Sequence, residues 1–174
     1  MFILNCTNLI FHKIIFNFVV CNRRKWYNRQ IYSEADDTTM EVMEKVQMKK
    51  VMLIDDNEID IFINQKVLEF NDFAESVINI QAAQEAIDVL QKGNEEDIPN
   101  VIFLDLNMPI VDGFKFLFEF SKMNELVRSK VKIIVLTSSD NVRDKEKVAA
   151  NPDVLAYISK PLTDSKLELI SSML

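Results

Sequence analysis

Glycine, proline and cysteine are all scarce in this chain of 174 residues, which has two glycines, four prolines and two cysteines. Flexible linkers and low-complexity segments need glycine or proline in quantity, so the composition excludes both. The cysteines, Cys6 and Cys21, lack the spacing of a metal site and are too few for a disulfide framework. We therefore expect the protein to work in a reducing compartment, the cytoplasm.

An excess of positive charge is also absent, because the formal net charge at pH 7 is −7. Proteins that bind nucleic acids neutralise phosphates with lysine and arginine, so this balance argues against that class. Hydrophobic residues make up 48% of the chain and charged residues 27%, which is typical of a globular domain with a buried core. The length fits one domain of ordinary size.

The first 30 residues differ from the rest, since they contain five basic residues, no acidic one and a strongly apolar stretch at 1–20. The basic cluster follows the apolar stretch, and a cleavage site is missing, so a secretory signal fits poorly. Lys13 would cost about 2.5–3.5 kcal/mol inside a membrane span. His12 is interpreted as an incidental residue with no chemical role.

Met48 opens a run that suits the start of a self-contained domain, MKKVMLIDD. We therefore expect residues 1–47 to be an N-terminal extension, disordered or translated from a misplaced start, and residues 48–174 to form the domain. An amphipathic or membrane-associating extension and a cleaved signal remain as alternatives, although we do not expect a membrane partner.

From Met48 onward, short apolar runs alternate with segments of helical periodicity. The runs predict five strands, at 50–54, 75–80, 101–104, 131–136 and 154–158. The first predicted helix has its apolar residues three and four positions apart: Ile59, Phe62, Ile63, Val67 and Phe70. Further helices are predicted at 81–92, 112–126, 140–150 and 163–174. This alternation indicates an α/β domain in which helices cover both faces of a parallel sheet.

Polar residues follow four of these predicted strands. Asp55 and Asp56 come after the first strand, Asp105 after the third, Thr137 at the end of the fourth and Lys160 after the fifth. Parallel sheets bind ligands at the carboxyl ends of their strands, where the strand order reverses. We therefore expect all five side chains to meet at one edge of the sheet.

Three carboxylates at one edge repel one another, by about 4 kcal/mol for each close pair at an effective dielectric constant near 20. An oxygen-ligated Mg²⁺ ion would offset this repulsion. An aspartate beside such a cation can attack phosphorus and form an aspartyl phosphate, while Lys160 and Thr137 contact the transferred group. Each residue alone is more often a turn or surface residue, so the prediction depends on the complete set.

The motifs VMLIDDNEID, VIFLDLNMPIVDGF, IIVLTSS and YISKP occur in this order between Met48 and Leu174. Together they resemble the receiver domains of two-component response regulators. The resemblance implies a flavodoxin-like, doubly wound (βα)5 fold with a five-stranded parallel sheet of strand order 2-1-3-4-5. It also implies a domain that receives a phosphoryl group from a sensor histidine kinase or a histidine phosphotransfer protein.

The resemblance assigns the phosphoryl group and the metal to particular residues. Asp105 matches the phosphoacceptor. Asp56 matches the direct magnesium ligand and Asp55 the ligand that acts mainly through water. Asp105 itself and the backbone carbonyl of Asn107 complete the expected Mg²⁺ site.

The remaining motif residues match the switch of the family. Thr137 matches the hydroxyl that moves toward the phosphoryl group, and Tyr157 the aromatic residue that swings inward with it. Lys160 matches the lysine that pairs with the phosphate, and a cis Lys160–Pro161 bond is expected. Gly113 is expected to provide the turn after Pro109.

These matches predict a stand-alone regulator without an output domain. It would signal through phosphorylation-dependent contact with an unidentified protein target, within a phosphorelay. It would not be an enzyme, beyond promoting its own phosphorylation and dephosphorylation. One alternative is a haloacid-dehalogenase-like phosphohydrolase, which is disfavoured because Asn107 stands where such enzymes need an acidic residue. The other is a receiver that serves only as a docking module.

Overall fold

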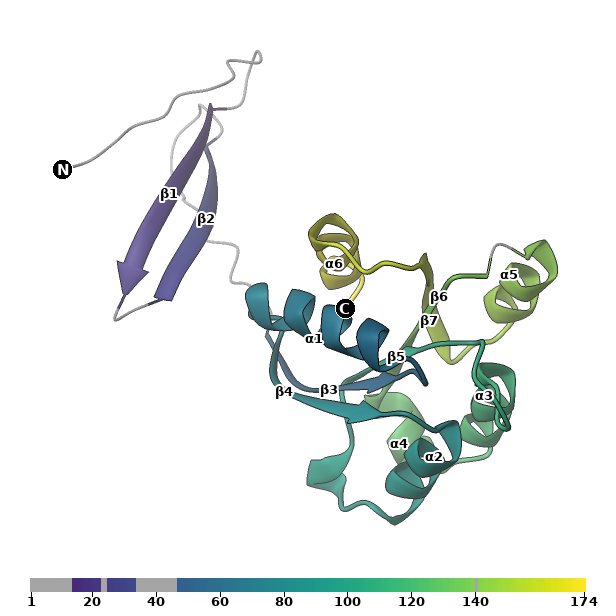
Figure 1. Cartoon of the computed structure of the whole chain (residues 1–174). Helices are drawn as coiled ribbons and strands as arrows, with labels where there is room; N and C mark the ends of the chain where they lie inside the picture. The colour runs from purple at the N-terminus through teal and green to yellow at the C-terminus, as the bar shows by residue number, and fades with distance from the viewer. Residues whose placement is uncertain (1–13, 23–24, 34–46, 140) are drawn as a thin grey trace. The chain divides into compact units, whose positions relative to one another are not determined.

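The computed structural model describes residues 14–22, 25–33, 47–139 and 141–174 (Figure 1). The chain divides into two units, Met1–Lys45 and Val46–Leu174, and each is described here by itself. In the first unit, strands β1 (Ile14–Asn22) and β2 (Lys25–Ser33) form an antiparallel hairpin.

The hairpin occupies part of the N-terminal extension expected at residues 1–47, of which residues 1–13, 23–24 and 34–46 lie outside the described residues. The two segments are rich in isoleucine, valine and aromatic residues, which favour strands, and every position from Ile14 to Asn22 pairs with one from Lys25 to Ser33. A lone two-stranded hairpin is at most marginally stable in water. That the extension is disordered, or is translated from a misplaced start, stays a prediction.

The second unit contains a five-stranded parallel sheet, in the order β4-β3-β5-β6-β7. Its strands are β3 (Met48–Ile54), β4 (Ala74–Ile80), β5 (Val101–Leu104), β6 (Lys132–Thr137) and β7 (Val154–Ser159). Counted within this unit, the strand order is 2-1-3-4-5. The predicted doubly wound α/β fold is therefore confirmed.

The helices of this unit are α1 (Glu58–Phe70), α2 (Ala83–Lys92), α3 (Gly113–Ser121), α4 (Glu125–Lys130), α5 (Val142–Ala149) and α6 (Asp164–Ser171), with a short 3₁₀ helix at Glu95–Asp97. The single helix predicted at 112–126 is wrong, because the chain forms α3 and α4 there. Asn124 starts α4, since its side chain accepts a hydrogen bond from Val127 N at 2.9 Å. Across the described ranges, every helix is too short or too polar to cross a bilayer.

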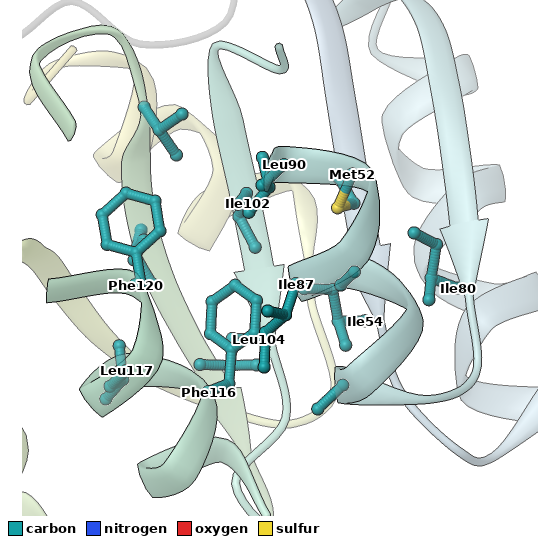
Figure 2. Close-up of a cluster of buried hydrophobic side chains, with 14 of the residues drawn as sticks. Met52, Ile54, Ile80, Ile87, Leu90, Ile102, Leu104, Phe116, Leu117 and Phe120 are labelled. Carbon is teal, nitrogen blue, oxygen red and sulfur yellow. The ribbon is translucent and has the colours of Figure 1, made fainter. Parts of the chain in front are cut away.

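Alternate residues of the strands pack into two separate layers. Val51 and Leu53 belong to a cluster with residues of α1 and α6, whereas Met52 and Ile54 belong to one with residues of α2, α3 and α4. Figure 2 shows the second cluster, in which these side chains are labelled: Met52, Ile54, Ile80, Ile87, Leu90, Ile102, Leu104, Phe116, Leu117 and Phe120. Burial on both faces fixes the positions of the strand ends that carry the site.

Helix α1 buries a different face from the one that its periodicity predicted. The buried residues are Ile61, Asn64 and Leu68. The predicted face is mostly exposed, with four large apolar residues on the surface: Ile59, Phe62, Ile63 and Phe70. The pattern predicted the helix correctly, but α1 has apolar residues on two sides and only one of them meets the sheet.

The loop after β5 turns at Ile110, which has a φ of 67°, and Val111 N donates to Pro109 O at 2.7 Å. The expectation that Gly113 makes this turn is therefore wrong. Gly113 begins α3 and approaches β5 closely. A Cβ atom there would lie 2.5 Å from Asp105 O and 2.8 Å from Leu106 Cα, so only glycine fits without displacing the backbone.

Gly113→Ala should lower the free energy of unfolding by about 1–3 kcal/mol, because the added methyl group overpacks against the backbone of Asp105 and Leu106, just after β5. Chemical denaturation of the variant and the unchanged protein measures this difference. Lys115→Ala, at an exposed position of the same helical turn, is the control and should have little effect. Equal stability of Gly113→Ala and the unchanged protein would contradict the close approach.

Candidate functional site

Asp55 and Asp105 lie side by side just beyond the ends of β3 and β5. Asp105 N donates to Ile54 O at 2.9 Å, and Asp55 N donates to Ile80 O at 3.1 Å. The sheet pairing thus continues for one residue past each strand. The two carboxylates are held by backbone hydrogen bonds at the same edge of the sheet.

Asp56 joins these two residues to form an acidic triple, Asp55, Asp56 and Asp105. Each of the three offers an oxygen atom, and these atoms lie within 4.8 Å of one another. Asp55 and Asp105 are 4% and 5% exposed, whereas Asp56 is exposed. Asn57 N donates to Asp55 Oδ1 at 3.0 Å and so fixes the orientation of that carboxylate.

Asp105 Oδ1 is buried and has no hydrogen-bond partner among the described residues. A buried acceptor without a partner costs about 1–3 kcal/mol, and more when it is charged. Hard cations such as Mg²⁺ bind carboxylate oxygens, so the acidic triple has the chemistry of a divalent-cation site. The unpartnered oxygen is the feature of this structure that fits a bound cation best.

Lys160 brings the only positive charge that the structure describes in contact with the acidic triple. Its Nζ lies 2.7 Å from Asp55 Oδ2 and 3.2 Å from Asp105 Oδ2, and the side chain is 12% exposed. Lys160 N donates to Thr137 O at 2.9 Å, which places the residue just past the end of β7. The Lys160–Pro161 peptide bond is cis, as expected.

A third carboxylate contacts Lys160, and the sequence did not predict it. Asp60 Oδ2 lies 2.8 Å from Lys160 Nζ. Asp60 is in the first turn of α1, where an acidic residue ordinarily complements the helix dipole. The sequence pattern does not predict this contact, because the contact depends on how α1 packs at the edge of the sheet.

Lys166 holds the backbone on both sides of Lys160. Its Nζ donates to Ser159 O at 2.7 Å and to Pro161 O at 2.9 Å. One ammonium from α6 therefore binds the carbonyl groups that flank Lys160. These bonds limit the movement of the Lys160 backbone relative to the acidic triple.

The pKa values of Asp55 and Lys160 are both raised in the site, but for different reasons. Burial raises the pKa of Asp55 above its ordinary 3.8, and the hydrogen bond from Lys160 offsets only part of this effect. Burial alone would lower the pKa of Lys160, but hydrogen bonds to Asp55 and Asp60 raise it above 10.5 overall. Three carboxylates stabilise the charged form of Lys160. Asp55, by contrast, contacts one ammonium, which also contacts two other carboxylates.

Thr137 is linked to Tyr157 through the residue between β6 and α5, Ser139. Thr137 is fully buried, and its Oγ1 accepts hydrogen bonds from Ser139 N at 3.2 Å and from Asn107 Nδ2 at 3.5 Å. The Tyr157 hydroxyl donates to Ser139 O at 2.5 Å. Ser139 Oγ also donates to Asp144 Oδ2 at 2.9 Å. Hydrogen bonds through Ser139 therefore connect Thr137 with α5 and with Tyr157 on β7.

Of the residues predicted for the site, Asp55, Asp56, Asp105 and Lys160 lie together. Thr137 ends the strand next to β5, and its hydroxyl accepts a hydrogen bond from Asn107, whereas the Tyr157 hydroxyl donates to Ser139 O. Residues 51–171 match the response regulator receiver domain family. The chain belongs to this family. Membership leaves the phosphohydrolase alternative without support.

The comparisons agree on the fold and on the family. The receiver is 31% identical to a response regulator receiver protein from Dyadobacter fermentans, with a TM-score of 0.64, over 72% of this chain and 97% of that one. It is 30% identical to the Mn²⁺-bound form of response regulator Rcp1, with a TM-score of 0.54, over 71% and 88%. Rcp1 from Synechocystis is 32% identical in sequence over 55% of this chain and 66% of its own length, so the chain spans slightly less than two thirds of that relative.

The carboxyl group of Asp55 should titrate above pH 3.8 in the metal-free receiver, as followed by carbon NMR of the side chain. Because the pKa of Asp55 is higher in the folded than in the unfolded state, protonated Asp55 contributes to the stability of the folded receiver at pH values below the unfolded pKa. This contribution to folding stability is lost as the pH rises through the folded pKa. A divalent cation should move the titration to lower pH, because it favours the carboxylate. A midpoint below 3.8 without metal would contradict the dominance of burial.

Proposed function

We propose that this receiver accepts a phosphoryl group on Asp105 from the phosphohistidine of a histidine kinase or a histidine phosphotransfer protein, and that it needs Mg²⁺. The observation that supports this most is the unpartnered Asp105 Oδ1, which is buried beside two carboxylates and an ammonium. An oxygen so placed is ready to accept a ligand, since its own surroundings leave it unsatisfied.

In the proposed reaction, an Asp105 oxygen forms a bond to phosphorus while the bond from phosphorus to the histidine nitrogen breaks. The nitrogen keeps the electron pair and is protonated. Lys160 offsets charge on the phosphoryl oxygens, and the Thr137 hydroxyl donates a hydrogen bond to one of them. These groups position the reactants and stabilise the developing charge, which is most of what phosphoryl transfer requires.

Mg²⁺ would be held by the acidic triple and the backbone carbonyl of Asn107. Bound there, the ion would neutralise the carboxylates and the phosphoryl oxygens. Asp55 is oriented for this by its hydrogen bond from Asn57 N, and Asp56 is exposed at the mouth of the site. The cation would therefore contact buried carboxylate oxygens, from Asp55 and Asp105, and an exposed one, from Asp56.

Phosphorylation would change contacts at a distance from Asp105. A phosphoryl group adds about two negative charges and three acceptor oxygens. When Thr137 turns toward it, the hydrogen bond from Ser139 N to Thr137 Oγ1 changes, and with it the bonds of Ser139 to Tyr157 and Asp144. The surface around α5 and β7 would then differ between the two states, and a target protein could distinguish them.

The exposed apolar side of α1 supports a protein as the phosphoryl donor. Ile59 and Phe62 are 68% and 61% exposed, and they follow Asp56 along the chain. An open, largely apolar hollow of about 630 Å³ extends along this helix. It is lined by Phe62, Ile63, Lys66, Val67, Glu69, Phe70 and Asp164. Large exposed apolar patches are a feature of protein–protein contact sites.

Incubation with a phosphorylated histidine phosphotransfer protein and Mg²⁺ should add one phosphoryl group to the receiver, measured by intact mass spectrometry. Asp105→Asn should abolish the addition, because the amide oxygen is a poor nucleophile. Asp97→Asn, at an exposed residue outside the site, is the matched control and should be phosphorylated normally. Absence of transfer to the unchanged receiver, or transfer that persists in Asp105→Asn, would contradict the proposal.

Mg²⁺ at about ten times its dissociation constant should raise the free energy of unfolding by about 1.4 kcal/mol, because it binds only the folded receiver. Thermal or chemical denaturation with and without the ion measures this gain. Asp56→Asn should reduce it strongly, and Asp97→Asn should leave it unchanged. An equal gain in Asp56→Asn would show that the ion binds elsewhere.

A further inference from the structure

The ammonium of Lys160 has three N–H donors, and three carboxylates lie within 3.2 Å of it. The two shorter contacts are to Asp55 at 2.7 Å and Asp60 at 2.8 Å, and the longest is to Asp105 at 3.2 Å. Asp60 is not part of the acidic triple. It therefore binds the lysine of the site from α1, outside the group that would hold the cation.

We propose that Asp60 is a positioning residue that holds the Lys160 ammonium toward α1 in the unphosphorylated receiver and competes for it with the phosphoryl group. This inference rests on the proposed function, because it describes how the same site is kept in its resting state. Asp60 touches no reacting atom in this scheme and acts through Lys160 alone.

Of the two partners with the shorter contacts, Asp60 is the one that Lys160 can release more easily. A phosphoryl group brings three acceptor oxygens to Asp105, so the ammonium must give up a bond it already has. Asp55 is 5% exposed at its side chain, and loss of the ammonium would leave a buried charge. The side chain of Asp60 is 32% exposed, so water can hydrate its carboxylate when the ammonium leaves.

The proposed competition predicts the direction in which the affinity for a phosphoryl mimic should change. In this scheme, the contact with Asp60 stabilises Lys160 in its resting position and opposes movement of the ammonium toward the phosphoryl group. Removing the charge of Asp60 should therefore favour the phosphorylated state. Partly exposed ion pairs contribute about 0.2–1 kcal/mol, which corresponds to an increase of up to about fivefold in affinity for a phosphoryl mimic.

The test is the affinity for beryllofluoride, a phosphoryl mimic, titrated by fluorine NMR at a Mg²⁺ concentration that saturates each variant. Asp60→Asn should bind about two- to fivefold more tightly than the unchanged receiver. Glu58→Gln is the matched control, because it removes the same charge from the same turn of α1, where Glu58 accepts a hydrogen bond from Gln81. Its affinity should stay unchanged.

Asp60→Glu tests whether the charge or the shape of the Asp60 side chain limits the affinity for beryllofluoride. It keeps the carboxylate and should bind with the affinity of the unchanged receiver. Asp60→Ala should tighten binding as Asp60→Asn does. Unchanged or weaker binding by Asp60→Asn, an equal gain in Glu58→Gln, or an equal gain in Asp60→Glu would each overturn the role of Asp60. Failure of the unchanged receiver to bind beryllofluoride would instead overturn the proposed function, and this inference with it.

Discussion

The crowding of carboxylates around one ammonium is the constraint on which the rest of the site depends. Lys160 contacts Asp55, Asp60 and Asp105, and Asp56 lies beside Asp55 and Asp105. Among the described residues, Lys160 is the one cation in contact with this group, so the negative charge is only partly balanced. Each close carboxylate pair costs about 4 kcal/mol at an effective dielectric constant near 20. The sheet holds Asp55 and Asp105 at this edge through backbone hydrogen bonds, so the residues cannot separate to relieve the repulsion. A site built in this way favours the binding of a cation, which offsets the excess negative charge.

The same frame connects the site to the surface. Thr137 ends β6, and its hydroxyl reaches Tyr157 and Asp144 through the single residue Ser139. The ammonium of Lys160 reaches α1 through Asp60. Under the proposed function, a change in charge at Asp105 would act on two regions of the surface, one around α5 and β7 and one on α1. The exposed apolar residues of α1 make the second region suitable for a protein contact.

The sequence predicted those features that follow from strand order and strand ends. Parallel strands bring their carboxyl ends to one edge, so the positions of Asp55, Asp105 and Lys160 followed from finding the strands. Features that depend on the angles between elements were missed. The contact of Asp60 with Lys160 requires the packing of α1, and the buried side of α1 could not be chosen because both sides carry apolar residues. The break before α4 depends on one capping residue, Asn124, inside a continuous apolar pattern.

The central claim is that the acidic triple binds one divalent cation through oxygens from all three residues. Anomalous diffraction from crystals of the receiver grown with Mn²⁺ tests it most directly. We predict a single strong anomalous peak within bonding distance of Asp55 or its bound water, Asp56 and Asp105. A peak elsewhere on the receiver would contradict the account. So would the absence of any peak when the three carboxylates keep the positions they have without metal.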